Sequence, residues 1–138
     1  MQIKRKASAH WQGTGKEGKG TLTSQSGVLS NTQYGFNSRF ADGIGTNPEE
    51  LIGAAHAGCY SMKLAFNLNA SGFTAESIDT DAIVILEDGC ITEVQLTTRV
   101  KTEGLTKEKF EELAADAKAN CPVSKLLKAN ITLTTVLV

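Results

Sequence analysis

Hydrophobic and polar positions change their spacing several times along the chain, and these changes predict the order of its elements. Residues 2–11 alternate between the two classes, which is the period of a β-strand. Short strands are expected at Thr21–Ser24 and Val28–Asn31, with a turn at Ser26-Gly27 between them. From Asn47 to Gly72 apolar side chains recur every three or four positions, which predicts one long helix.

The second half of the chain gives an equally regular pattern. Ala82–Glu87 and Cys90–Lys101 are rich in Ile, Val and Thr, and the dipeptide Asp88-Gly89 between them predicts a tight hairpin. Thr106 can cap a second helix, and the last strand is expected at Ile131–Val138. The apolar stripe of that second helix consists of Phe110, Leu113, Ala114, Ala117 and Cys121.

The order of these elements predicts the fold class. Pro122 must interrupt the second helix, and a short helical turn is expected at Val123–Lys128. Strands, a long helix, a strand hairpin, a helix and a terminal strand are typical of an α+β fold, with the helices on one face of a mainly antiparallel sheet. The length of 138 residues suits a single domain spanning residues 1–138.

The long helix has a well-marked start and an unusual middle. Asn47 can cap its first turn, Pro48 suits the first helical position, and Glu50 can complete a capping box. Its apolar positions include Leu51, Ile52, Ala55, Cys59, Met62 and Phe66, but small and apolar residues continue around most of the helix, which indicates burial on more than one side. Residues 53–58, GAAHAG, would let another helix or a sheet approach closely.

Composition and charge exclude several classes of function. Lys and Arg total 14 against 15 Asp and Glu, and the basic residues are scattered, so neither nucleic acid nor an anionic membrane is expected as a partner. No run of about 18 apolar residues is present. The three cysteines are odd in number and widely spaced, which is unlike a secreted disulfide framework, and we expect a cytoplasmic protein.

The cysteines carry the candidate chemistry. Cys121 precedes a proline and takes the position of an N-cap, where the helix dipole favours a thiolate. Cys59 lies in mid-helix without such help and needs a cation from elsewhere. Arg39 is the leading candidate, with Glu49 to hold its guanidinium in a bidentate pair. A mid-helix cysteine is also often an inert, buried side chain.

The spacing of Glu49 and Cys59 places a condition on that site. They are ten positions apart, which on an unbroken helix is about 15 Å of axial rise. Either the helix breaks, or the glutamate comes from the antiparallel helix of a second subunit in a symmetric dimer. Glu49 also complements the helix dipole, whatever else it does.

The remaining candidates have simpler interpretations. His56 lies three residues before Cys59 and can neighbour it, but a solvent-facing or structurally hydrogen-bonded histidine is the favoured interpretation. His10 is expected to be an ordinary strand residue, and Cys90 to be incidental. Three Cys and two His show no CxxC or HxxxH spacing, so no zinc site is expected.

The sequence also resembles a known family over nearly its whole length. The motifs are HWQG at 10–13, GKGT at 18–21, SGVL at 26–29, YGFNSRF at 34–40, GTNPEELIGAAHAGC at 45–59, GFT at 72–74, SIDT at 77–80 and CPVSKLLKANITL at 121–133. With these motifs the chain resembles the OsmC/Ohr family of osmotically inducible and organic hydroperoxide resistance proteins, and more closely its OsmC branch. It departs from the family pattern at Gly58 and Tyr60 and in the additional Cys90.

The resemblance implies a fold, an activity and a set of site residues. It implies an intertwined homodimer with two long central helices, and a peroxidase acting on organic hydroperoxides and hydrogen peroxide. Cys59 would be the peroxidatic cysteine, Cys121 the resolving one, and Arg39 and Glu49 the pair that activates Cys59. It implies no metal, haem or flavin, and an external reductant that is a small dithiol or a lipoylated protein.

Two other functions stay open from the residues alone. One is a non-catalytic dimeric protein that binds a hydrophobic small molecule and has inert, buried cysteines. The other is a structural dimer associated with stress. Loss of two thiols on treatment with a hydroperoxide would distinguish the enzyme from both.

Overall fold

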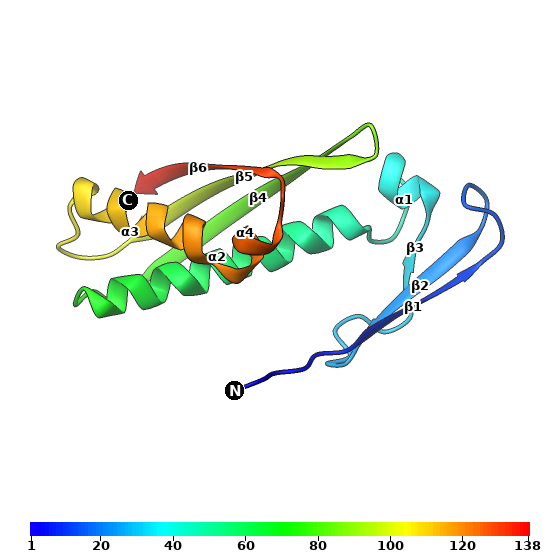
Figure 1. The fold of residues 1–138 in the computed structure, drawn as a ribbon, viewed down its shortest axis with the longest axis horizontal. Coiled ribbons are helices and arrows are strands. Elements are labelled where there is room, and N and C mark those ends of the chain that lie inside the picture. The colour runs from blue at the N-terminus through cyan, green and yellow to red at the C-terminus, as the bar shows by residue number, and fades with distance from the viewer. The chain divides into compact units, whose positions relative to one another are not determined.

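The computed structural model describes residues 1–138, which form two compact units, Met1–Leu51 and Ile52–Val138 (Figure 1). Each unit has its own three-stranded sheet. The two units are described separately below. The prediction that residues 1–138 form a single domain stays a prediction.

The first unit is an antiparallel meander followed by a short helix. Its strands are β1 (Ala7–Gln12), β2 (Lys19–Ser24) and β3 (Thr32–Tyr34), in the order β1-β2-β3. The rings of Trp11 and Tyr34 are 5.4 Å apart across the sheet. Glycine is required at position 20 on the strand between them, because a Cβ there would lie 2.5 Å from each ring.

Three details of this unit differ from the sequence predictions. The strand predicted for residues 2–11 begins only at Ala7. The strand predicted at Val28–Asn31 is wrong, because these residues form a loop that is closed by hydrogen bonds between Ser24 and Leu29. The helix α1 (Phe36–Phe40) follows β3 and was not predicted.

The long helix α2 (Pro48–Ala70) is unbroken, as predicted. The Oδ1 atom of Asn47 accepts the backbone N–H of Glu50 at 2.8 Å, and the Asn47 amide donates to the Glu50 carboxylate at 3.3 Å. Thr46 Oγ1 donates to the same carboxylate at 2.8 Å. The predicted cap is therefore confirmed, but the capping box is not formed, because Glu50 accepts from the side chain of the cap residue and not from its backbone N–H.

The second unit confirms the α+β prediction. Strands β4 (Ser77–Glu87) and β5 (Cys90–Lys101) form an antiparallel hairpin, and β6 (Asn130–Leu137) pairs with β5 in parallel. Asp88 and Gly89 both have positive φ, as a two-residue hairpin turn requires. The helices α2 and α3 (Lys107–Asn120) lie along one face of this sheet, and the five-residue α4 (Pro122–Leu126) follows α3 (Figure 1).

The core of the second unit lies between the two long helices and the sheet. From α2 it takes Tyr60, Leu64 and Leu68, which are four residues apart and fully buried. From β5, α3 and their connections it takes Val94, Leu96, Val100, Leu105, Phe110, Leu113, Ala114, Ala117 and Cys121, which include the whole predicted stripe of α3.

The apolar stripe expected on α2 does not face the core of the second unit. Met62 and Phe66 are 64% and 65% exposed, because a helix that is apolar on several sides does not specify which side meets the sheet. The close approach predicted for residues 53–58 occurs at Gly53, where a Cβ would lie 3.4 Å from Val84 of β4. Gly58 has no neighbour within 4 Å of such an atom.

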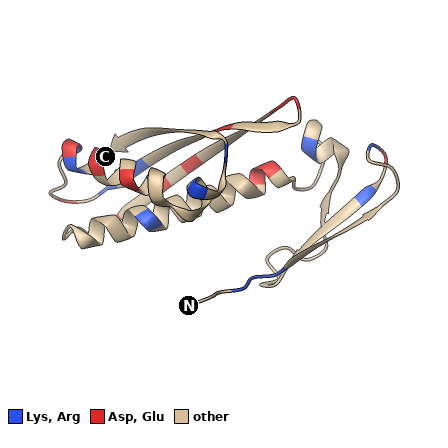
Figure 2. Cartoon of the chain, viewed as in Figure 1, with Lys and Arg blue, Asp and Glu red and all other residues tan.

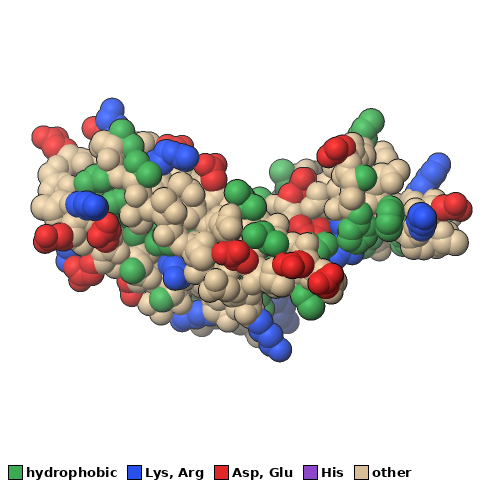
Figure 3. Space-filling view, turned by 90° about the horizontal axis from the view of Figure 1, so that it is seen from above, with side chains coloured by type: hydrophobic (Ala, Val, Ile, Leu, Met, Phe, Trp, Pro, Cys, Tyr) green, Lys and Arg blue, Asp and Glu red, His purple; other side chains and the backbone are tan.

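Charges are scattered over both units. Both signs of charge occur in each unit, and the surface shows hydrophobic side chains between charges of both signs (Figures 2 and 3). None of the helices has the length and hydropathy needed to cross a membrane.

Candidate active site

The fold brings together two cysteines that are 62 positions apart in the sequence. Cys59 lies in the middle of α2, and Cys121 lies between α3 and α4. The two thiols lie close enough to shift one another's pKa, and neither is part of a disulfide. Cys90 is exposed at the start of β5.

Cys121 is the N-cap of α4, as the sequence predicted. Its Sγ accepts a hydrogen bond from the backbone N–H of Ser124 at 3.5 Å, and Pro122 occupies the first turn of the helix. Burial alone would raise the pKa of Cys121. Hydrogen bonds from the Ser124 backbone, the Cys59 thiol, the Ser124 hydroxyl and the Val123 backbone outweigh burial and lower that pKa below its ordinary value.

Cys59 has the opposite balance. Burial raises its pKa, and the neighbouring Cys121 sulfur raises it further, because a second sulfur that can carry negative charge favours the protonated form of Cys59. The backbone N–H of Val123 acts in the other direction but is outweighed. None of the groups that shift the pKa of Cys59 is a cation. Cys121 is therefore the more acidic thiol of the pair, which confirms the sequence argument.

Behind the two cysteines lies a fully buried histidine. His56 Nε2 is 2.8 Å from the hydroxyl of Ser124, so it joins α2 to α4. Its Nδ1 atom has no hydrogen-bond partner, and burial lowers its pKa. The interpretation as a structurally hydrogen-bonded histidine is confirmed, and the solvent-facing alternative is wrong.

Arg39 and Glu49 form a close ion pair in the first unit. Nε and one terminal nitrogen of Arg39 lie 2.9 and 2.8 Å from the same Glu49 oxygen, Oε1. The two-oxygen fork expected from the sequence is therefore not formed, and Glu49 Oε2 is buried without a partner. The Arg39 guanidinium also stacks on Phe40, 5.0 Å from the ring centroid.

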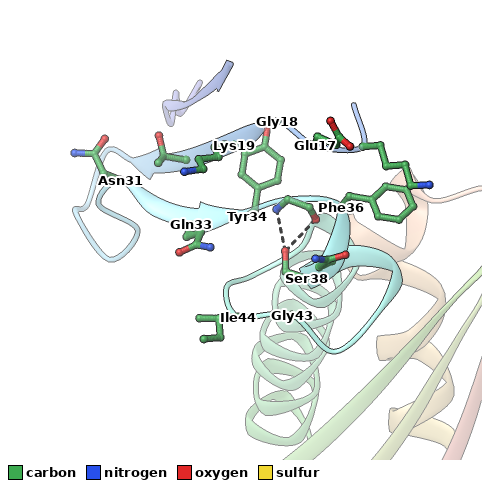
Figure 4. A pocket seen from close by; sticks show the side chains of 15 residues that line it. Glu17, Gly18, Lys19, Asn31, Gln33, Tyr34, Phe36, Ser38, Gly43 and Ile44 are labelled. Atoms are coloured by element: carbon green, nitrogen blue, oxygen red, sulfur yellow. Dashed lines mark hydrogen bonds between the residues drawn. The ribbon is translucent and has the colours of Figure 1, made fainter. Parts of the chain in front are cut away.

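A hydrogen-bond network holds α1 against the start of α2. The hydroxyl of Ser38 donates to Thr46 O at 2.8 Å, and the Asn47 amide donates to Ser38 O at 3.0 Å. Ser38 also hydrogen-bonds both backbone atoms of Gly35, as Figure 4 shows. These bonds fix the turn of α1 that carries Arg39, so the cation is positioned by backbone and side-chain polar contacts.

An open hollow of about 870 Å³ lies beside this network (Figure 4). Its wall is formed by residues of β2, β3, α1 and the loops around them, and its apolar side chains are Tyr34, Phe36 and Ile44. No cysteine lines it.

Sequence reasoning missed Ser124 as a member of the cysteine site. The signal was present in the CPVS motif, because a serine three residues after an N-cap stands where its backbone N–H meets the cap atom. No group of three His, Cys, Asp or Glu side chains is placed to hold a metal ion.

Comparisons with known proteins identify the family of the chain. The family model described as OsmC-like protein matches residues 41–136. The chain is 50% identical over 137 residues to a protein of Escherichia coli named peroxiredoxin OsmC, covering 96% of each chain. It is 29% identical over 114 residues to the organic hydroperoxide resistance protein OhrB of Bacillus subtilis, covering 81% of this chain and 84% of the relative.

Solved structures share the fold. The crystal structure of Bacillus subtilis OhrB matches with a TM-score of 0.68 and 28% identity, covering 99% of this chain and 98% of that one. An OsmC-like protein from Mycoplasma pneumoniae matches with a TM-score of 0.77 at 15% identity, covering 100% and 99%, which shows the fold alone. With a family match over most of its length and a relative at half identity, the chain belongs to the OsmC-like protein family.

Proposed function

We propose that this protein is a cysteine-based peroxidase that reduces organic hydroperoxides, and hydrogen peroxide, with Cys59 and Cys121 as its redox pair. The observation that carries the proposal is the meeting of two free thiols from distant parts of the chain, one of them in an environment that favours the thiolate. The 50% identity to a named peroxiredoxin supports it. The alternatives of a binding protein and of a structural dimer receive no support from the relatives.

The reaction follows from the chemistry of the two thiols. The thiolate of Cys59 attacks the distal oxygen of the hydroperoxide, the O–O bond breaks, and an alcohol leaves after it gains a proton. Cys59 is then a sulfenic acid, which condenses with Cys121 to a disulfide and releases water. An external dithiol, such as a lipoyl group, supplies two electrons and two protons to restore both thiols. The residues require no prosthetic group for these steps.

The first step needs a cation at Cys59, because the local environment favours its protonated form. We assign that role to Arg39, with Glu49 holding the guanidinium. The guanidinium would lower the pKa of Cys59 and stabilise the developing alkoxide. Glu49 and Cys59 stand ten positions apart on a helix without a break, so we infer that the ion pair serves the cysteine of a second copy of the chain.

The exposed face of α2 fits such a homodimer. Met62 and Phe66 present apolar surface there, and Gly58 leaves room for another backbone. We propose that residues 1–138 fold as one OsmC-like domain within this intertwined dimer. Because the three cysteines are odd in number and widely spaced, unlike a secreted disulfide framework, we also propose that the protein works in the reducing cytoplasm.

The first experiment tests the assignment of the cysteines. In a Cys90→Ser background, Cys59→Ser should abolish the reduction of cumene hydroperoxide. Cys121→Ser should still form sulfenic acid, trapped with dimedone and seen by mass spectrometry, but no intrachain disulfide. Cys90→Ser alone serves as the control and should keep full activity. Turnover that persists without Cys59 would disprove the proposal.

The second experiment tests whether Arg39 acts across subunits. Cys59→Ser and Arg39→Ala variants are each expected to be inactive alone. After they are unfolded and refolded together, mixed dimers should contain one complete site, restoring about one quarter of the wild-type activity. If Arg39 acts within its own chain, no complete site can form and activity stays absent.

A further inference from the structure

The hydrogen-bond chain from His56 through Ser124 to Cys121 is not used by the proposed reaction. His56 Nε2 contacts the Ser124 hydroxyl at 2.8 Å, and the backbone N–H of Ser124 donates to Cys121 Sγ at 3.5 Å. All three residues are buried. The chain therefore connects a titratable ring on α2 to the thiol that caps α4.

Ser124 joins the histidine to the cysteine through two different atoms. Its hydroxyl hydrogen-bonds His56 Nε2 at 2.8 Å, and its backbone N–H donates to Cys121 Sγ at 3.5 Å. His56 therefore holds the residue whose backbone caps the sulfur.

We propose that His56 is a positioning residue for disulfide formation, which anchors Ser124 so that its backbone N–H stays on Cys121 Sγ and the thiol is held near Cys59. The inference rests on the proposed function, because it assumes that Cys121 is the resolving cysteine. The hydrogen bond of His56 goes to Ser124, and the histidine acts through that residue.

His56 assists the second step of the proposed reaction, in which the disulfide forms. Cys121 Sγ attacks Cys59 Sγ of the sulfenic acid, the S–S bond forms and the S–O bond breaks. The hydroxide that leaves takes up the proton that Cys121 loses, so water is the only product besides the disulfide. The backbone N–H that Ser124 donates to Cys121 Sγ favours the thiolate, and the link from α2 to α4 keeps the two sulfurs together.

Other ionisable groups do not offer an equivalent contact. Cys59 faces Cys121 from α2 and is its reaction partner. Lys118 lies in the last turn of α3 and Lys125 in α4, where it is exposed. Neither lysine is among the groups that shift the pKa of Cys121.

The test uses the full chain with Cys90→Ser and follows a single turnover with one equivalent of cumene hydroperoxide. Quenched samples are analysed by mass spectrometry for sulfenic acid, trapped with dimedone, and for disulfide. His56→Leu and Ser124→Ala should each slow disulfide formation about tenfold while the sulfenic acid forms at the wild-type rate, so sulfenic acid accumulates. His56→Gln, whose amide can donate to Ser124, should stay within about twofold of the wild type.

A double variant decides whether His56 acts through Ser124. In the Ser124→Ala background His56→Leu should add no further slowing, because the chain is already broken. Lys118→Gln, which removes a nearby charge but no contact to sulfur, is the matched control and should change nothing. The proposal is overturned if His56→Gln is as slow as His56→Leu, or if the effect of His56→Leu persists without the serine.

A measurement without peroxide separates this inference from the proposed function. The ultraviolet absorbance of thiolate is titrated with pH in the reduced protein, where Ser124→Ala and His56→Leu should shift the first thiol titration to higher pH and His56→Gln should not. If His56→Leu fails to fold, Ser124→Ala and Ser124→Thr carry the same comparison. If the wild-type protein forms no sulfenic acid, the proposed peroxidase function is refuted but the role of His56 is not. If the thiol titration of His56→Leu is not shifted, the role of His56 is refuted.

Discussion

The two units of the chain differ in what holds them together. All twelve fully or nearly buried hydrophobic residues lie in the second unit, residues 52–138, where two helices cover a sheet. In the first unit the buried residues are Gly20 and three polar ones, Ser38, Thr46 and Glu49. The second unit therefore has its own hydrophobic core, whereas the first is organised by strand pairing and polar contacts.

The proposed chemistry is divided in the same way. The two thiols belong to the unit with the core, and the ion pair of Arg39 and Glu49 belongs to the unit without one. A packed core can position a sulfur to within hydrogen-bond reach of another. A meander with no buried apolar side chains gains little free energy from its own burial, so it needs a further surface, which we propose a second copy of the chain supplies.

The largest effect is expected from removing that second copy. Met62→Glu with Phe66→Glu places two charges on the exposed face of α2 without touching the core of the second unit. The variant should become monomeric, keep its helical circular dichroism, and lose hydroperoxide reduction about 100-fold or more. Ala115→Glu, on the exposed face of α3, is the matched control. A monomer with full activity would show that one chain contains a complete site.

The next largest effect concerns the ion pair. Arg39→Ala should lower kcat/KM for cumene hydroperoxide about 100-fold, because one charged donor at a developing anion is lost. It should also raise the pKa of Cys59, measured by alkylation rate against pH. Arg39→Lys should restore only part of the activity, since an ammonium lacks the planar fork. An unchanged alkylation profile in Arg39→Ala would remove Arg39 from the site.

A smaller difference is expected between the losses of unfolding free energy caused by one substitution in each unit. Leu64→Ala removes a fully buried side chain from the core of the second unit and should cost about 3 kcal/mol of unfolding free energy. Val28→Ala, at a residue of the first unit that is 84% exposed, should stay within about 0.5 kcal/mol. Urea unfolding followed by circular dichroism measures both. Equal losses would mean that Val28 is buried in the assembled protein.

The smallest effect expected is a pH dependence from His56. Burial lowers its pKa in the folded state, so the unfolded chain binds more protons as the pH falls below the ordinary histidine value of about 6.5. Unfolding free energy should therefore be highest above that pH and should decline below it, down to the folded pKa. In His56→Gln this decline should be weaker. A decline of the same size in both proteins would assign it to other groups.

Much of the second unit was predictable because its signals are local. The Asp88-Gly89 turn, the Thr106 cap and the stripe ending at Cys121 each depend on a few neighbouring residues, and each is confirmed. The same holds for Cys121 as an N-cap. The first unit was predicted less well, because the Val28–Asn31 loop is held by Ser24, whose hydroxyl and backbone meet Leu29 across a turn.

The sequence by itself determined the long helix from Pro48, the hairpin and the acidic character of Cys121, because periodicity, turn residues and capping act over a few positions. Only the tertiary structure decided that Cys121 lies beside Cys59 and that His56 reaches Ser124. It also decided which side of α2 is buried: Tyr60, Leu64 and Leu68 face the core, whereas Met62 and Phe66 are exposed. These are contacts between segments far apart in the chain, and they depend on which side of an apolar helix the sheet covers.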